Sequence, residues 1–168
     1  MNRLLPALLP AALLLAGCFG GAAPQRHYTV LDPAAGVVAP AALDLDVRMA
    51  PDLRAASAPT LYRADGSVST YPGLTYYAPL ELAIPRALRE LGPEALGLKP
   101  GDRLDLDVLD FCVDRRTPDG VPVARVTLSA DGRAPVTVAK PLPAGATPLQ
   151  TRALLASALL EAIRDARK

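Results

Sequence analysis

Tryptophan is absent from this 168-residue sequence, and only five tyrosines and two phenylalanines are present. Histidine occurs once and cysteine twice, so few side chains can bind transition metals or act as a nucleophile and its base. The sequence also lacks a phosphate-binding glycine loop and a nucleophile elbow. We therefore expect a protein that is not an enzyme and that binds no metal.

An excess of positive charge is also lacking, because 18 basic residues stand against 17 acidic ones. Nucleic-acid-binding proteins normally carry a basic excess, so we expect no nucleic-acid partner. No apolar run reaches the roughly 20 residues that a helix needs to span a bilayer. Apolar residues nevertheless make up 51% of the chain, which excludes disorder and, at this length, favours one folded domain.

Residues 1–17 are interpreted as a signal peptide. Arg3 supplies a short positive region, and residues 4–15 form an apolar stretch of secretory length. The stretch ends in Leu15-Ala16-Gly17-Cys18, which resembles the bacterial lipobox. This resemblance implies cleavage before Cys18, a diacylglyceryl group on its thiol and a further acyl chain, such as palmitate, on its amino group. Two or three acyl chains would hold the protein on a membrane. The alternative is a plain secretory signal followed by a chance cysteine.

The residues after Cys18 predict where the protein resides. Phe19 follows the cysteine, where an aspartate would favour the inner membrane by the known sorting rule, so we expect the outer membrane and a protein that faces the periplasm. Residues 18–25 then form the lipidated cysteine and a flexible tether rich in glycine and alanine, and residues 26–168 form a single periplasmic domain. The covalent lipid on Cys18 is the only non-protein group that we expect.

Strands are predicted by period-two alternation and by turn signals. We expect a short strand at 28–31, a strand at 43–49, a hairpin of 61–63 and 68–71 around an Asp-Gly turn, and a three-stranded meander within 103–139. Within 103–115 the apolar parity changes at 108–109, which predicts a β-bulge there.

Two helices complete the predicted fold. An apolar face between Pro79 and Leu91 indicates the first, although Pro85 should either kink it or move its start to 83–85. Thr147 and Gln150 predict a capping box for the second. Its expected core stripe is Leu149, Ala153, Ala156, Leu160 and Ile163, widened by Leu155 and Leu159. The fold class is therefore α+β, a mostly antiparallel sheet with two helices packed on one face.

Several isolated polar residues receive structural interpretations. Leu-Asp-Leu-Asp-Val occurs at 43–47 and at 104–108, and we expect solvated strand faces rather than a cation site because no calcium-binding loop accompanies them. His27 is expected to be solvated or at an interface. Cys112, between Phe111 and Val113, is expected to be a small buried residue.

Four of the five tyrosines fall within residues 62–77, immediately before Pro79 and Leu80. Tyrosine combines apolar area with a polar tip and suits an interface, but the same residues could pack the hairpin onto the helix. Both interpretations remain open at this point.

Four features of the sequence occur together, namely the lipobox, the Tyr28-Thr-Val-Leu31-Asp-Pro33 strand, the Leu61-Tyr62-Arg63 strand with its Asp-Gly turn, and the segment Tyr76-Tyr-Ala-Pro79-Leu80. In this combination the sequence resembles the ABC-type transport auxiliary lipoproteins of the PqiC type. The resemblance implies a non-catalytic component of a lipid transport system. Its partners would be an MCE-domain protein that bridges the periplasm and the associated ABC permease and ATPase, and the lipoprotein could form a homo-oligomeric ring. On this interpretation, the docking or self-association residues are Tyr28, Tyr62, Tyr71, Tyr76, Tyr77, Pro79 and Leu80.

Two other functions remain as alternatives. An envelope-assembly lipoprotein, of the LPS-assembly or secretin-pilot type, would share the anchor and the expected fold. A lipid-anchored hydrolase would need a serine or aspartate site with a base, and the sequence offers neither.

Overall fold

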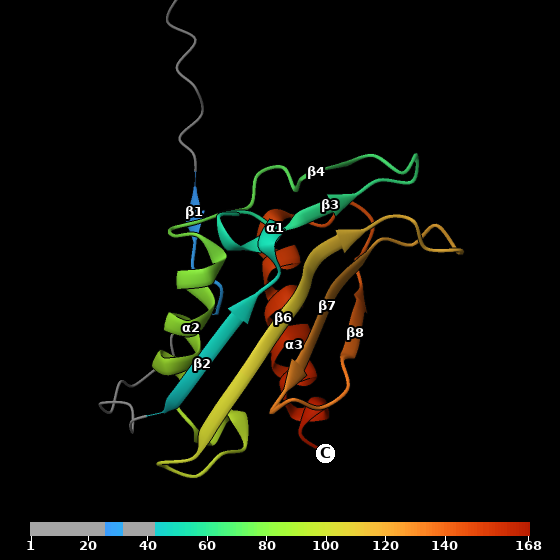
Figure 1. Cartoon of the computed structure of the whole chain (residues 1–168). Helices are drawn as coiled ribbons and strands as arrows, with labels where there is room; N and C mark the ends of the chain where they lie inside the picture. Colours follow the sequence, from blue (N-terminus) through green and yellow to red (C-terminus); the bar gives the residue numbers. More distant parts are fainter. Residues whose placement is uncertain (1–25, 32–42) are drawn as a thin grey trace, which may run out of the picture.

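The computed structural model describes residues 26–31 and 43–168 (Figure 1). The predicted signal peptide, Cys18 and the tether lie outside the described residues. Within the described part, no helix has both the length and the apolar character that a membrane crossing requires. The elements are β1 (His27–Tyr28), β2 (Asp44–Met49), α1 (Pro51–Arg54), β3 (Thr60–Tyr62), β4 (Val68–Thr70), β5 (Thr75–Tyr76), α2 (Leu80–Leu91), the 3-10 helix η1 (Glu94–Leu96), β6 (Arg103–Asp114), β7 (Val123–Ala130), β8 (Val136–Pro141) and α3 (Pro148–Ala166).

The long strand β6 organises the main sheet. On one side it pairs with β7, which pairs with β8, and both pairings are antiparallel, as the predicted meander requires. On the other side β2 and β3 follow one another along β6, and both run parallel to it. β4 closes the predicted hairpin with β3. The fold is α+β with a mostly antiparallel sheet, which confirms the predicted class.

The predicted bulge lies in β6. Val108 pairs with Leu128, but the next paired residue is Asp110, opposite Thr127, so Leu109 has no partner in the ladder. This extra residue changes which parity of the strand faces the core. Leu106 before the bulge and Phe111 after it are therefore both fully buried.

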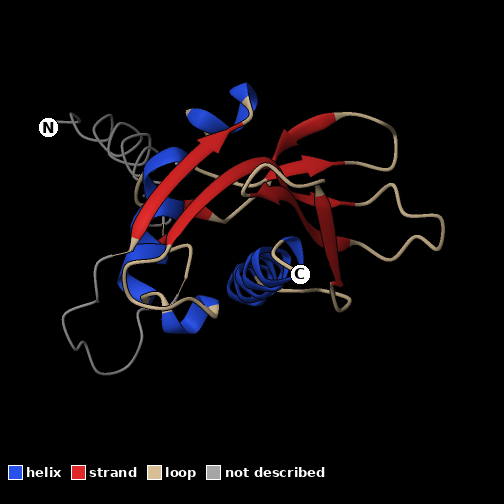
Figure 2. Ribbon diagram, turned by 60° about the horizontal axis from the view of Figure 1, so that its bottom comes forward, coloured by secondary structure: helices blue, strands red, loops and turns tan. Residues whose placement is uncertain are grey.

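Two helices pack on one face of this sheet, as expected. α2 contacts β2, whereas α3 crosses β7 and β8. Figure 2 shows α3 under the sheet, viewed nearly along its axis. α3 begins with the predicted capping box, because the Thr147 side chain accepts from the Gln150 backbone N–H and the Gln150 side chain accepts from the Thr147 backbone N–H.

Three local predictions were only partly correct. The first strand is limited to His27–Tyr28 rather than 28–31, because its partner β5 offers only two residues. α2 starts at Leu80, directly after Pro79, so Pro85 lies inside the helix and the alternative start at 83–85 is wrong. The buried stripe of α3 consists of Thr151, Arg152, Leu155, Ala158, Leu159, Ala162, Ile163 and Ala166, whereas Leu149 and Ala153 are exposed.

Candidate functional site: an apolar groove beside the N-terminal strand

The N-terminal segment is fixed beside residues distant from it in the sequence. β1 pairs in parallel with β5, with His27 opposite Thr75 and Tyr28 opposite Tyr76. The Tyr77 backbone N–H donates to the Tyr28 carbonyl at 3.2 Å, which extends this contact toward α2. The segments that carried the family resemblance at Tyr28 and at 76–80 therefore lie together.

The buried Arg152 of α3 holds the same segment from the other side. Its guanidinium donates to the Thr29 carbonyl oxygen and to Thr29 Oγ1, each at 3.3 Å. Val30 and Leu31, which follow, are buried in the core. The N-terminal segment is thus attached to both β5 and α3 and forms a stable wall for any site beside it.

A groove of about 360 Å³ lies between this segment and α2. It is lined by Tyr28, Thr29, Val30, Tyr77, Ala78, Ala83, Arg86, Ala87 and Glu90. The four α2 residues lie on one helical stripe, and the small side chains of Ala83 and Ala87 leave the space that larger residues would fill. The lining is largely apolar, so the groove suits an apolar ligand surface.

An ion pair lies on the helical side of this groove. Arg86 Nε lies 2.7 Å from Glu90 Oε1, and both side chains are exposed. The hydrogen bond and the charge of Glu90 raise the pKa of the Arg86 guanidinium. An exposed pair of this kind contributes little to stability, but it supplies one donor group and one acceptor group beside the apolar lining.

Three of the residues predicted for the interface belong to the core instead. Tyr76 and Leu80 are almost fully buried, and Tyr71, also buried, shares a 3.1 Å hydrogen bond between its hydroxyl and Thr151 Oγ1. The Tyr76 ring packs edge-on against Phe111, with ring centroids 6.2 Å apart. These three side chains cannot contact a partner in this conformation, so the interface prediction is wrong for them. The remaining candidate interface residues are Tyr28, Tyr62, Tyr77 and Pro79.

Tyr76 carries an unsatisfied polar group. Among the described residues its hydroxyl is buried without a hydrogen-bond partner. Burial raises the pKa of this phenol, an effect that the nearby charge of Arg152 opposes.

The remaining predicted residues are divided between two places. Tyr28 and Tyr77 line the groove, and Tyr77 is 74% exposed. The His27 ring lies 5.6 Å from that of Tyr77, and His27 is exposed, as predicted. Pro79 is half-buried at the start of α2. Tyr62 lies elsewhere, on the sheet face that α2 and α3 leave uncovered.

Tyr62 belongs to a cluster of charged residues. The guanidinium of Arg116 lies 4.0 Å from the centre of its ring, and that of Arg125 lies 5.5 Å from it. Arg125 forms ion pairs with Asp110 and Asp114. Hydrogen bonds from Arg116 lower the pKa of Asp114 to about 2, and the charge of Arg125 adds to this effect. Since these charges are paired with one another, the cluster is an internally satisfied structural network.

The two aspartate-rich motifs lie on adjacent strands with an offset of two residues, so that Leu45 pairs with Leu104 and Asp46 with Asp105. Their leucines face the core, and their aspartates face solvent beside arginines, as in the ion pair between Arg48 and Asp107 at 2.7 Å. In the part of the chain that the structure describes, no group of three or more potential metal ligands comes together. The prediction of a wet strand face is confirmed by Asp44 and Asp46, which are exposed beside the buried Leu45.

Cys112 is buried, as predicted, but on the sheet face opposite the main core. Its thiol donates to Asp110 Oδ2 at 3.4 Å. Burial and the Asp110 charge raise the pKa of the thiol, so it remains protonated and unreactive at neutral pH.

The sequence did not identify the α2 residues of the groove. Ala83 and Ala87 lie four positions apart on the helix, and Arg86 and Glu90 form an i,i+4 pair beside them. Small residues at this spacing next to a charged pair were the available signal. The signal was weak because the helix's buried face also contains alanine.

No protein-family model matches the chain, and no curated protein matches it either. Among solved structures, protein XCC0632 from Xanthomonas campestris, of the DUF330 family, is similar with a TM-score of 0.54 and 16% identity over 84% of this chain and 89% of that chain. A second structure, of an uncharacterized protein, gives a TM-score of 0.48 and 16% identity over 74% of this chain and 89% of that chain. At such identities the likeness concerns the fold alone, so the chain shares its fold with a DUF330 protein.

Proposed function

We propose that this protein is an outer-membrane lipoprotein, anchored through Cys18, that serves as the non-catalytic auxiliary component of an ABC and MCE type lipid transport system. Its partners would be an MCE-domain protein and, through it, the permease and ATPase. One observation carries the proposal. The segments at Tyr28 and at 76–80, which resemble the PqiC-type lipoproteins, fold against each other and line one apolar groove with α2.

The groove supports a role in binding another protein. Its floor is formed by small and aromatic side chains, with an ion pair beside them. An apolar helix face or an extended apolar segment of a partner would fill this space, and Tyr77 would lose much of its exposure on contact. We infer that the MCE-domain protein contributes this segment.

Affinity purification tests this proposal. The tagged protein, isolated from detergent-solubilised membranes, should recover an MCE-domain protein. Ala83→Glu places a charge in the groove lining and should reduce the recovery about tenfold or more, because the new carboxylate would have to be desolvated against an apolar segment. Ala153→Glu, at an exposed alanine of α3, is the matched control and should leave the recovery unchanged.

Recovery of no MCE-domain protein by the unmodified chain would overturn the proposed partner. Recovery of an outer-membrane barrel or a secretin instead would support the envelope-assembly alternative. The anchor has its own test, because Cys18→Ala should move the protein out of the membrane fraction. A Cys18→Ala protein that stayed membrane-bound would contradict the anchor.

A further inference from the structure

We propose that the end of the domain at which the tether enters is a membrane-contacting surface, which lies on the phospholipid bilayer. We call it the tether end. It comprises β1, the β3–β4 hairpin, the β4–β5 connection, the first turns of α2 and α3, and the β6–β7 turn. The inference rests on the proposed anchoring at Cys18 but not on the proposed transport partner.

The sheet register places these segments at one end of the molecule. Tyr62 pairs with Asp114, so the β3–β4 turn and the β6–β7 turn project side by side. An added Cβ at Gly73 would lie 3.2 Å from Pro148 Cγ, so the β4–β5 connection touches the first turn of α3. In Figure 1 all these segments lie at the upper end of the domain, as β1 does.

Most of the exposed large apolar side chains of the described part are gathered at this end. Six such side chains are present, namely Val68, Tyr77, Leu82, Leu109, Val121 and Leu149. Four of them, Val68, Leu82, Val121 and Leu149, belong to segments of the tether end, whereas Tyr77 lines the groove and Leu109 lies in the β6 bulge. Exposed apolar residues scattered singly are normal, but their collection at one end marks a surface that contacts another apolar phase.

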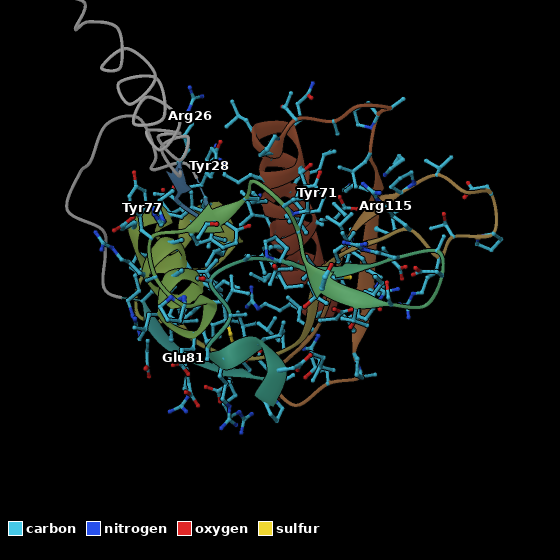
Figure 3. All side chains as sticks on the ribbon, turned by 90° about the horizontal axis from the view of Figure 1, so that it is seen from above. Arg26, Tyr28, Tyr71, Tyr77, Glu81 and Arg115 are labelled. Carbon is cyan, nitrogen blue, oxygen red and sulfur yellow. The ribbon has the colours of Figure 1, made fainter. Side chains whose placement is uncertain are left out.

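Polar residues at this end are also of the types found at a bilayer surface. Figure 3 looks down on the tether end, where Arg26 and Arg115 are labelled. Arg26, Arg115 and Arg63 of the hairpin turn are exposed and can approach anionic phospholipid headgroups.

The acidic residues of the two turns do not oppose this arrangement strongly. Asp65 accepts hydrogen bonds from the backbone N–H and the hydroxyl of Ser67, and Asp119 accepts one from the Val121 backbone N–H. Both carboxylates are thus engaged in shaping their own turns.

The short predicted tether keeps this end of the domain close to the bilayer that would hold the Cys18 anchor. Eight residues lie from Cys18 to Gln25, and covalent geometry limits the Cys18 to Arg26 span to about 28 Å even when fully extended. The described domain begins at Arg26, at the end where the apolar side chains gather. A lipid anchor on Cys18 therefore holds this end, rather than the end with η1, next to the membrane.

Single-tryptophan fluorescence tests the inference cleanly, because the chain contains no tryptophan of its own. Leu149→Trp and Leu109→Trp form a matched pair, since both leucines are exposed, at 54% and 43%, but only Leu149 lies at the tether end. Val68→Trp, at a position of β4 that is 60% exposed, provides a second reporter at that end. Each full-length lipidated variant is reconstituted into vesicles of phosphatidylethanolamine and phosphatidylglycerol, with or without brominated acyl chains, and the floated fraction is measured.

Brominated lipid should reduce the emission of Leu149→Trp and Val68→Trp about twofold and leave Leu109→Trp unchanged. Equal emission of all three variants in floated vesicles would overturn the membrane contact while leaving the anchor intact. Quenching of Leu109→Trp alone would place the opposite surface on the bilayer and would also overturn it. If the protein does not float, the Cys18 anchor fails, and both the proposed location and this inference fail with it.

Discussion

Replacing Leu159 by alanine should destabilise the domain by about 3 kcal/mol, whereas the same replacement at Leu149 should cost less than about 0.5 kcal/mol. Leu159 is fully buried in the core that α3 forms with β7 and β8. Truncation removes three carbons, worth about 2 kcal/mol in transfer free energy, and leaves a cavity that adds to the loss. Leu149 is 54% exposed, so its truncation removes few contacts.

Urea denaturation followed by circular dichroism measures the difference. With a slope of about 2 kcal/mol per molar urea, the Leu159→Ala midpoint should fall by about 1.5 M, and the Leu149→Ala midpoint should hardly move. The slopes of the two variants should agree, because both expose the same surface on unfolding. If Leu149→Ala were as damaging as Leu159→Ala, α3 would pack through the face that the apolar pattern suggested, and the orientation described above would be wrong.

Other predictions concern acid stability, a turn and the thiol. Folding lowers the pKa of Asp114 from its ordinary value to about 2. The ionised carboxylate therefore stabilises the fold above about pH 4, and the domain should lose about 2 kcal/mol of stability as the pH falls toward 2 and this group is protonated. Asp114→Asn should flatten this part of the stability-against-pH curve, and an unchanged curve would contradict the role of Arg116. Gly73→Ala should destabilise the domain more than Gly66→Ala. The positive φ of each glycine makes either replacement cost about 1 kcal/mol of stability, but only at Gly73 would the new methyl group also meet a neighbouring side chain. Thermal unfolding measures both losses, and equal losses would refute the contact at Gly73. Cys112 should resist a thiol reagent in the folded protein and react after denaturation, so rapid labelling of the native state would show that it is not buried.

Local features of the fold could be predicted because short segments determine them. Asp65-Gly66 requires a tight turn, and Gly66 indeed adopts a positive φ of 82°. The change of parity at 108–109 could only be accommodated by an extra residue in the strand. The Thr147 and Gln150 side chains cap α3 without any tertiary contact.

The partners of each strand were not predictable in the same way. Alternation shows which side chains of a strand face the core, but it does not identify the neighbouring strand. The parallel pairings of β2 and β3 with β6 join segments that are about 50 to 60 residues apart, and nothing local encodes them. These pairings nevertheless decide that Tyr62 lies beside Asp114 and away from the groove.

The face of α3 was misassigned because the helix is rich in alanine, which fits either side. The predicted stripe also did not include the polar residues Thr151 and Arg152. Both are buried, since Tyr71 supplies a hydrogen-bond partner for Thr151 and the Thr29 carbonyl accepts from Arg152. Partners from distant segments thus made burial of polar residues possible.

The candidate site was predictable only in part. The concentration of tyrosines pointed to the correct region, but composition could not separate Tyr76, packed on Phe111, from the exposed Tyr77 next to it. Tyr76 ends β5 with its side chain in the core, whereas Tyr77 lies in the bend that follows the strand. The α2 residues of the groove became visible only once β1 was placed beside the helix.

Photo-crosslinking from within the groove tests the central claim most directly. A photoreactive amino acid is introduced at Ala83, in the groove, or at Ala153, an exposed alanine of α3, and the cells are irradiated intact. Position 83 should form an adduct with an MCE-domain protein, and position 153 should form none. An adduct of equal yield from both positions, or the absence of an MCE-domain protein from the adduct at position 83, would contradict the proposed docking site.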